Sequence, residues 1–197
     1  MGGKEYLDLN SSVYLSCLSK NLDNHLSVNW GSKESQEKRF EVLMNVSQDF
    51  IESSIIDVGC GLGHLLDFLK NRKFRGTYYG IDILKKMVEN AQRRHPEFVF
   101  ENSELSSCYN NCYDYVVMSG VFTFANPMIY QKEIYNAFRV CKKGIAFNTL
   151  SSWALQKEKG EFYADPCKTL EFCSKFTKKI MLRHDYLPHD FTIYMYK

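Results

Sequence analysis

The sequence has little net charge, no long apolar run and no paired-cysteine motif. Its 25 lysines and arginines nearly balance 23 acidic residues, and a formal charge of +2 provides no field for holding nucleic acid or an anionic membrane. No stretch is apolar for long enough to cross a bilayer, and the first residues have no apolar signal core behind them. We therefore expect a cytoplasmic protein that binds neither nucleic acid nor a membrane.

The seven cysteines lack the spacing of a metal site or of a disulfide framework. Their number is odd, none forms a CxxC pair, and several sit inside apolar runs. Cys108 and Cys112 are close in sequence but have no second ligand pair nearby, so no metal site is predicted. Reduced thiols in a hydrophobic core are the expected state.

The length and composition are those of one ordinary globular domain. A chain of 197 residues, 45% hydrophobic and 24% charged, is long enough to bury a full core. No internal repeat, linker or low-complexity segment divides it. We predict a single domain over residues 1–197, with a helical cap or lid in 1–50 and the core in 51–197.

The most informative stretch is Ile55–Leu66. It opens as a β-branched apolar run typical of a buried parallel strand, passes through Gly59, Gly61 and Gly63, and continues with apolar residues at helical spacing. Glycines allow a tight turn and a close approach of the backbone to a ligand. About 20 residues further on, Tyr78–Asp82 is a second apolar strand that ends in an acid, where nucleotide sites keep the carboxylate for ribose hydroxyls.

Short apolar strands then alternate with amphipathic helices. We expect strands at 54–58, 76–82, 98–100, 113–118 and 144–148, and helices at 63–72, 84–94, from Pro127 onward and at 166–176. Two β-rich runs, 178–186 and 190–196, flank a short turn containing Pro188 and favour an antiparallel hairpin. Alternating βα units predict a doubly wound α/β fold, a mostly parallel sheet with helices on both faces.

The glycine turn Asp57–Gly63 and the later Gly80-Ile81-Asp82 together resemble the S-adenosylmethionine (SAM) site of class I methyltransferases. The resemblance implies a SAM-dependent methyltransferase with a Rossmann-like core, SAM as cofactor and S-adenosylhomocysteine as product. It also implies a seven-stranded sheet of order 3-2-1-4-5-7-6, with strand 7 antiparallel, under an N-terminal helical cap. The alternative is a Rossmann-like turn that binds another nucleotide or none.

The resemblance assigns to SAM the residues around the strand ends, namely Asp57, Gly59, Cys60, Gly61, Gly63, Asp82, Ile83, Asn102 and Ser119. The glycines would approach its methionyl and sugar parts. Asp82 would accept hydrogen bonds from the ribose hydroxyls, and Ile83 would cover one adenine face. Asn102 stands where the family usually has an acid for the adenine amino group, and its amide oxygen can still accept that bond. Ser119 would lie beside the methionyl end.

Asp57 and the N-terminal segment each allow two interpretations. Asp57 either holds the glycine turn through backbone amides or contacts the SAM amino group. Trp30, Gly31, Ser32 and Arg39 are candidates for a lid over SAM, as in the family. Ser32 is also suited to cap the helix that follows. Arg39 either clamps the SAM carboxylate or is an exposed helical arginine.

Methyl transfer from a sulfonium is an in-line displacement, so alignment supplies much of the rate, and an acceptor that must lose a proton also needs a base. The predicted hairpin turn brings His189, His184 and Tyr186 to the active edge of the sheet. His189 is the first candidate base, because imidazole titrates near neutral pH. The alternative is that this group only holds the rim of the hairpin.

The acceptor is not fixed by a motif. Nucleic-acid amino-methyltransferases carry two adjacent prolines after the fourth strand, whereas this chain has Ser119–Phe122 there. We therefore predict methylation of an oxygen or nitrogen of a small polar metabolite by a monomer or homodimer. The segments Trp30-Gly31-Ser32 and Leu187–Phe191 resemble those of bacterial small-molecule methyltransferases of natural-product or surface-glycan pathways. The alternatives are a protein or RNA methyltransferase working with a partner subunit, and a non-catalytic SAM-binding protein.

Overall fold

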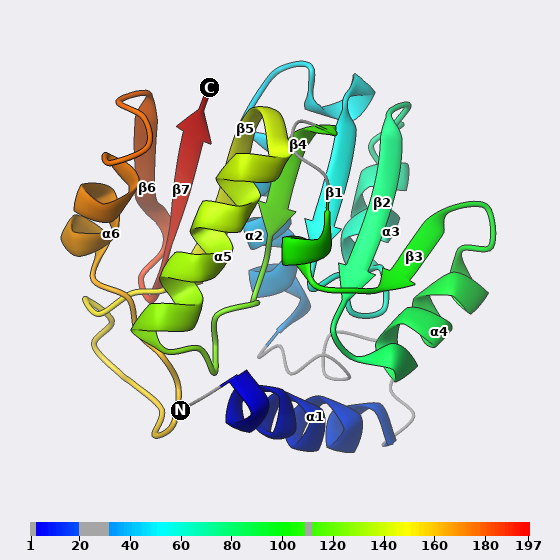
Figure 1. The fold of residues 1–197 in the computed structure, drawn as a ribbon, viewed down its shortest axis with the longest axis horizontal. Helices are drawn as coiled ribbons and strands as arrows, with labels where there is room; N and C mark the ends of the chain where they lie inside the picture. The colour runs from blue at the N-terminus through cyan, green and yellow to red at the C-terminus, as the bar shows by residue number, and fades with distance from the viewer. Residues whose placement is uncertain (1–2, 20–31, 109–111) are drawn as a thin grey trace.

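A computed structural model describes residues 3–19, 32–108 and 112–197. A seven-stranded sheet of order β3-β2-β1-β4-β5-β7-β6 runs through the molecule (Figure 1). Strands β1 to β5 pair in parallel, and β7 is antiparallel to both of its neighbours, β5 and β6. The strand order and the single antiparallel strand implied by the resemblance are both confirmed.

The strands are β1 (Ser54–Val58), β2 (Thr77–Asp82), β3 (Val99–Asn102), β4 (Tyr113–Met118), β5 (Cys141–Leu150), β6 (Ile180–Leu187) and β7 (Asp190–Tyr196). The helices are α1 (Gly3–Ser19), α2 (Lys33–Met44), α3 (His64–Lys70), α4 (Lys85–Arg94), α5 (Pro127–Val140) and α6 (Pro166–Cys173), with short 3-10 turns η2 (Phe50–Glu52) and η3 (Leu105–Ser107). Strand β5 is longer than the expected 144–148 because β4 pairs with it from Cys141 and β7 pairs with it as far as Leu150.

Local sequence signals set where several helices begin. Asn126 caps α5 by accepting a hydrogen bond from the amide of Ile129, and Pro127 occupies the first turn, where its missing N–H costs nothing. Asp165 and Pro166 repeat this arrangement at the start of α6. These caps fix where the chain leaves the sheet and turns back over it.

The inner strands β1, β4, β5 and β7 are largely buried on both faces of the sheet, which explains why they are mostly apolar. In β1, Ile56 belongs to the core cluster shared with α5 and α6, while the adjacent Ile55 belongs to the cluster shared with α2 and α3. Helix α2 contributes Phe40 and Leu43 to that second cluster. The segment 33–44, expected as part of a cap, is therefore also a structural layer of the core.

Helix α1 lies across the carboxyl ends of the parallel strands, at the bottom of Figure 1. The hydroxyl of Tyr6 donates to the carbonyl oxygen of Val121 at 3.0 Å, and the ring of Tyr14 meets that of Phe124 edge-on, with centroids 6.1 Å apart. These contacts join α1 to the loop after β4. None of the helices in the described residues is both long and apolar enough to cross a membrane.

Candidate active site

A cavity of about 620 Å³ lies between α1 and the carboxyl ends of β1, β2 and β4. Its walls come from α1, α2 and α5 and from the segments that follow the first four strands. This is where the strand order reverses, between β1 and β4, and where open α/β sheets bind their ligands. The volume falls within the range of about 300–1,000 Å³ that is usual for small-molecule sites.

The glycine turn after β1 forms one wall of the cavity. The amides of Gly59 and Cys60 both donate to the carbonyl oxygen of Ile81, at 2.8 and 3.0 Å. Gly59 has a φ of +70°, and a Cβ added there would lie 2.8 Å from a methyl carbon of Val121. Only glycine satisfies both constraints, so the spacing seen in the sequence reflects the backbone path past the cavity.

Asp82, at the end of β2, is buried and ties its strand to the glycine turn. One carboxylate oxygen accepts from the amide of Gly61 at 3.0 Å, and the other accepts from the amide of Leu84 at 2.8 Å. Burial raises the pKa of Asp82 to about 6, although both hydrogen bonds favour the charged form. Its carboxylate is thus fixed in place where it lines the cavity.

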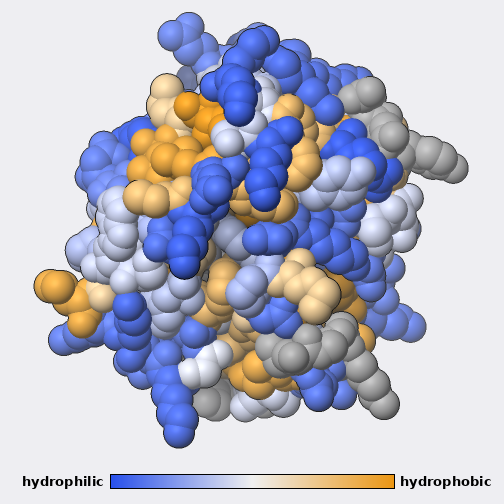
Figure 2. Space-filling view, turned by 60° about the vertical axis from the view of Figure 1, so that its left-hand side comes forward, coloured by the Kyte–Doolittle hydropathy of each residue, from blue (hydrophilic) through white to orange (hydrophobic). Residues whose placement is uncertain are grey.

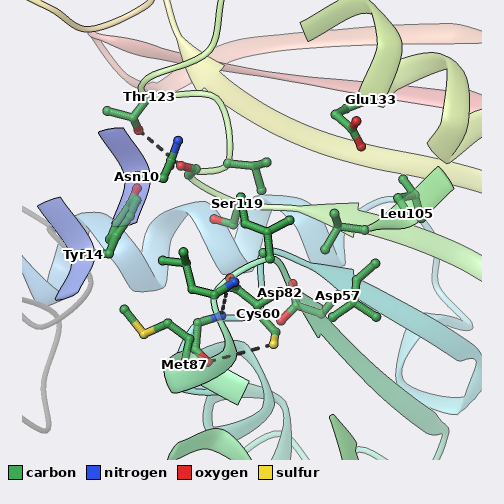
Figure 3. Close-up of a pocket in the computed structure, with 18 of the residues that line it drawn as sticks. Asn10, Tyr14, Asp57, Cys60, Asp82, Met87, Leu105, Ser119, Thr123 and Glu133 are labelled. Carbon is green, nitrogen blue, oxygen red and sulfur yellow. Dashed lines mark hydrogen bonds between the residues drawn. The ribbon is translucent and has the colours of Figure 1, made fainter. Parts of the chain in front are cut away.

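Asp57 lines the same wall but is held differently. Its carboxylate accepts a hydrogen bond from the hydroxyl of Tyr78 at 2.7 Å, and burial raises its pKa to about 7. The turn amides are bonded to Ile81 and Asp82, so the structure gives the turn-holding role to Asp82. Figure 3 shows Asp57, Cys60 and Asp82 together on the strand side of the cavity.

The other predicted cofactor residues of the core lie around this wall. Ile83, Asn102 and Ser119 line the cavity. The side-chain nitrogen Nδ2 of Asn102 donates to the backbone carbonyl oxygen of Asp82 at 2.9 Å. The hydroxyl of Ser119 donates to the side-chain oxygen Oδ1 of Asn148 at 3.3 Å. Gly63 is not among the lining residues. It precedes α3 with a φ of +80°, where a Cβ would lie 2.9 Å from the ring of His95.

The lid candidates divide into three groups. Trp30 and Gly31 lie outside the described residues. Ser32 accepts a hydrogen bond from the amide of Ser35 at 3.0 Å and caps α2. Arg39 lines the cavity, is only 9% exposed, and forms an ion pair with the buried Asp190. The interpretation of Arg39 as an exposed helical arginine was therefore wrong.

The three candidate bases gather at the β6–β7 hairpin, and none of them is a lining residue of the cavity. His184 shares a hydrogen bond of 2.7 Å between its Nε2 and the hydroxyl of Ser151. The hydroxyl of Tyr186 donates to Asp190 at 3.1 Å. Burial, helped by the charge of Arg39, lowers the pKa of His189. Their catalytic role stays a prediction.

Sequence reasoning missed several lining residues on the helices. Tyr6, Asn10 and Tyr14 all line the cavity from α1, and their spacing of four residues, which places them on one helix face, could have identified them. Figure 3 shows Asn10 and Tyr14 entering from this side. Burial raises the pKa of Tyr14 to about 12, so its phenol stays protonated.

Glu133, on α5, is the other important omission. Its side chain is 17% exposed, it lines the cavity, and burial raises its pKa. Its one ion pair in the described part of the chain is with Lys132, whose Nζ lies 3.9 Å from a carboxylate oxygen. The i, i+4 spacing from Ile129, another lining residue, was the signal in the sequence.

Comparison with known proteins places this site in a family. A family model described as a methyltransferase domain matches residues 55–144. A putative methyltransferase of Mycobacterium tuberculosis is 31% identical over 167 residues, which cover 79% of this chain and 98% of the relative. The chain belongs to the class I SAM-dependent methyltransferases.

Solved structures share the fold of this methyltransferase. Magnesium protoporphyrin IX methyltransferase of Synechocystis, solved with S-adenosylhomocysteine, superposes with a TM-score of 0.74 at 14% identity, covering 98% of each chain. A SAM-dependent methyltransferase of Archaeoglobus fulgidus gives a TM-score of 0.68 at 15% identity, covering 85% of this chain and 95% of that one. At these identities the likeness extends to the fold alone.

Proposed function

We propose that this methyltransferase transfers the methyl group of SAM to an oxygen or nitrogen of a small polar metabolite that shares the cavity with the cofactor. The observation that carries the proposal is that residues line the cavity from two opposite sides. Its strand side has the glycine turn and the fixed carboxylate of Asp82, and α1 with Tyr6 and Tyr14 covers the other side. A cavity of about 620 Å³ suits a small acceptor beside the cofactor.

On the strand side, each residue has a role that its contacts support. Gly59 and Gly61 let the backbone approach the methionyl and sugar parts, with Cys60 between them and Gly63 shaping the exit into α3. Asp82 accepts from the ribose hydroxyls, since its position is already fixed by two backbone amides. Asp57, a buried carboxylate beside the turn, accepts from the SAM amino group.

Residues of the neighbouring loops and of α2 are proposed to bind the adenine and methionyl ends of SAM. Ile83 packs against one adenine face, and Asn102 accepts from the adenine amino group. Ser119 lies beside the methionyl part, and Arg39 binds its carboxylate, because a guanidinium is suited to carboxylate geometry. Trp30, Gly31 and Ser32 complete the proposed lid, together with α1.

For an acceptor that must lose a proton, we propose Glu133 as the base. It lines the cavity, and burial raises its pKa toward the range in which a carboxylate is an effective proton acceptor. His189, His184 and Tyr186 come after it in the proposal because they stand at the hairpin outside the lining. The chemistry of the step needs only alignment and proton removal, since the leaving thioether is neutral.

The face of the molecule shown in Figure 2 favours a small acceptor over a macromolecular one. On this face, apolar residues form separate groups divided by hydrophilic side chains (Figure 2). A stable partner subunit would instead need a larger continuous apolar patch. The bacterial natural-product and surface-glycan pathways remain the proposed setting.

The test is a methylation assay with methyl-labelled SAM and a panel of metabolites or a cell extract, followed by mass identification of the labelled product. We expect label in a small molecule with the wild-type protein and at least about tenfold less with Asp82→Ala when SAM is limiting. Calorimetry with SAM and S-adenosylhomocysteine provides the binding control. Label in protein or RNA, or the absence of binding heat with both compounds, would overturn the proposal.

A further inference from the structure

The C-terminal hairpin reaches the cavity through one buried ion pair. Arg39 Nε on α2 lies 2.5 Å from Asp190 Oδ2, at the first residue of β7. The Asp190 side chain is completely buried, and that of Arg39 is 11% exposed. Arg39 lines the cavity and Asp190 does not, so Asp190 stands behind Arg39 as seen from the ligand space.

Asp190 is itself held by the hairpin. The hydroxyl of Tyr186 donates to the same Oδ2 at 3.1 Å. The Tyr186 hydroxyl also shares a hydrogen bond of 2.8 Å with the hydroxyl of Thr192. The other oxygen, Oδ1, is buried without a hydrogen-bond partner among the described residues. Burial raises the pKa of Asp190 to about 6 and the charge of Arg39 opposes that rise. Such a buried pair is an inefficient way to stabilise a fold.

The same hairpin contains a second arginine–aspartate pair that allows a direct comparison. Arg183 Nε and a terminal nitrogen donate to the two oxygens of Asp185, both at 2.8 Å. This pair has ideal bidentate geometry, but Asp185 is 64% exposed and neither residue lines the cavity. The hairpin therefore carries one exposed pair on its surface and one buried pair that ends at the site.

The position of Arg39 favours the amino-acid end of SAM. One helical turn earlier, Gln36 also lines the cavity, and its Nε2 lies 3.3 Å from Nδ1 of His64, the residue that follows the glycine turn. The contact between Gln36 and His64 therefore places the face of α2 that carries Arg39 next to the end of the glycine turn, which is the part of the site proposed to hold the methionyl group. The amino-acid part holds the only carboxylate of SAM, and a guanidinium offers five N–H donors in a fixed fork that can serve several acceptors at once.

We infer that Asp190, supported by Tyr186, is a positioning residue that orients the Arg39 guanidinium toward the carboxylate of SAM. The inference rests on the proposed function, because it concerns the same cofactor site. It assigns a role to the C-terminal hairpin: through one buried carboxylate, the last two strands set the geometry of a group on α2. Through its hydrogen bond to Asp190, Tyr186 thereby gains a role in positioning the group that binds the cofactor.

The experiment compares two ligands by calorimetry: S-adenosylhomocysteine, which has the amino-acid part, and 5′-methylthioadenosine, which lacks it. For Asp190→Asn we expect about a tenfold loss of affinity for S-adenosylhomocysteine, the size of one charge-assisted hydrogen bond, and a change of less than about twofold for methylthioadenosine. Asp185→Asn is the matched control and should change neither affinity. An equal loss for both ligands with Asp190→Asn, or no loss, would overturn the inference.

Two further variants keep the test decisive. Tyr186→Phe removes one hydroxyl and should fold even if Asp190→Asn does not; we expect a smaller loss, about threefold, confined to S-adenosylhomocysteine. If Asp190 acts through Arg39, Asp190→Asn should have no added effect in an Arg39→Ala background. An additive effect would contradict the inference. Failure of the wild-type protein to bind either ligand would instead remove the proposed function itself.

Discussion

The two sides of the cavity are built in different ways. On the strand side, the amides of Gly59, Cys60 and Gly61 and both oxygens of Asp82 are engaged in hydrogen bonds. On the helix side the lining consists of side chains, and Glu133 has one distant ion-pair partner within the described residues. A wall made of backbone is rigid and suits a constant ligand, whereas side chains on helices can change with the acceptor.

The largest expected effect concerns the helix side. Glu133→Gln keeps the size of the side chain but cannot take a proton, so we expect kcat/KM for methyl transfer to fall by about 100-fold or more. The Kd for SAM should not change, because the strand side is untouched. Steady-state kinetics with the identified acceptor and calorimetry with SAM measure the two quantities separately.

The control for Glu133 is His189→Ala, at the hairpin outside the cavity lining, which should leave turnover within about twofold of wild type. A turnover loss with His189→Ala and none with Glu133→Gln would reverse the assignment of the base. A weaker SAM affinity in Glu133→Gln would show that Glu133 contacts the cofactor. The two sides of the cavity would then not bind separate ligands.

The next largest effect concerns the strand side. Asp82→Ala removes the proposed ribose contact and leaves the amides of Gly61 and Leu84 without their acceptor. We expect the affinity for SAM to fall by about 10- to 100-fold and the melting temperature to fall as well, because each lost charge-assisted bond costs about 1.5–3 kcal/mol. Asp82→Asn, which keeps one acceptor oxygen, should lose less of both. Unchanged SAM binding in Asp82→Ala would contradict this account.

The strand side could be predicted from the sequence because its requirements are local. A positive φ at Gly59 demands glycine, and the acid at the end of β2 follows directly from its strand. The helix side depends on where distant segments pack: Tyr6 is 115 residues from its partner Val121. The strand pattern likewise predicted that the hairpin turn lies at the edge of the sheet where the parallel strands end. It could not predict that His184, Tyr186 and His189 lie outside the cavity lining, because the lining depends on how distant segments pack.

A third prediction sharpens the comparison through pH. Burial raises the pKa of Asp57 to about 7, above its usual value near 3.9, so between about pH 4 and pH 7 the unliganded protein holds a proton there that the unfolded chain has lost. The SAM ammonium requires the charged carboxylate, so binding must release this proton. Affinity for SAM should therefore fall by about tenfold between pH 8 and pH 6, following the fraction of ionised Asp57.

Calorimetry of SAM binding in two buffers of different ionisation enthalpy measures that proton release. Asp57→Asn, which cannot ionise, should bind SAM more weakly at pH 8 and should show a flatter pH profile. Some slope should remain, since the pKa of Asp82 is also raised, to about 6. A profile that is equally steep in Asp57→Asn would show that another group controls the pH dependence.

The smallest expected effect concerns how α1 closes the helix side. Tyr6→Phe keeps the ring in the cavity lining and removes only the 3.0 Å hydrogen bond to the carbonyl oxygen of Val121. A neutral hydrogen bond contributes about 1 kcal/mol, so we expect the KM for the acceptor to rise by about fivefold while the Kd for SAM stays within about twofold. Ser12→Ala is the matched control, because Ser12 is on the same helix and, among the described residues, its hydroxyl donates only to the carbonyl oxygen of Leu9, at 2.9 Å. If Tyr6→Phe weakens SAM binding as much as acceptor binding, α1 closes over both ligands equally, and the division of the cavity into a cofactor side and an acceptor side does not hold.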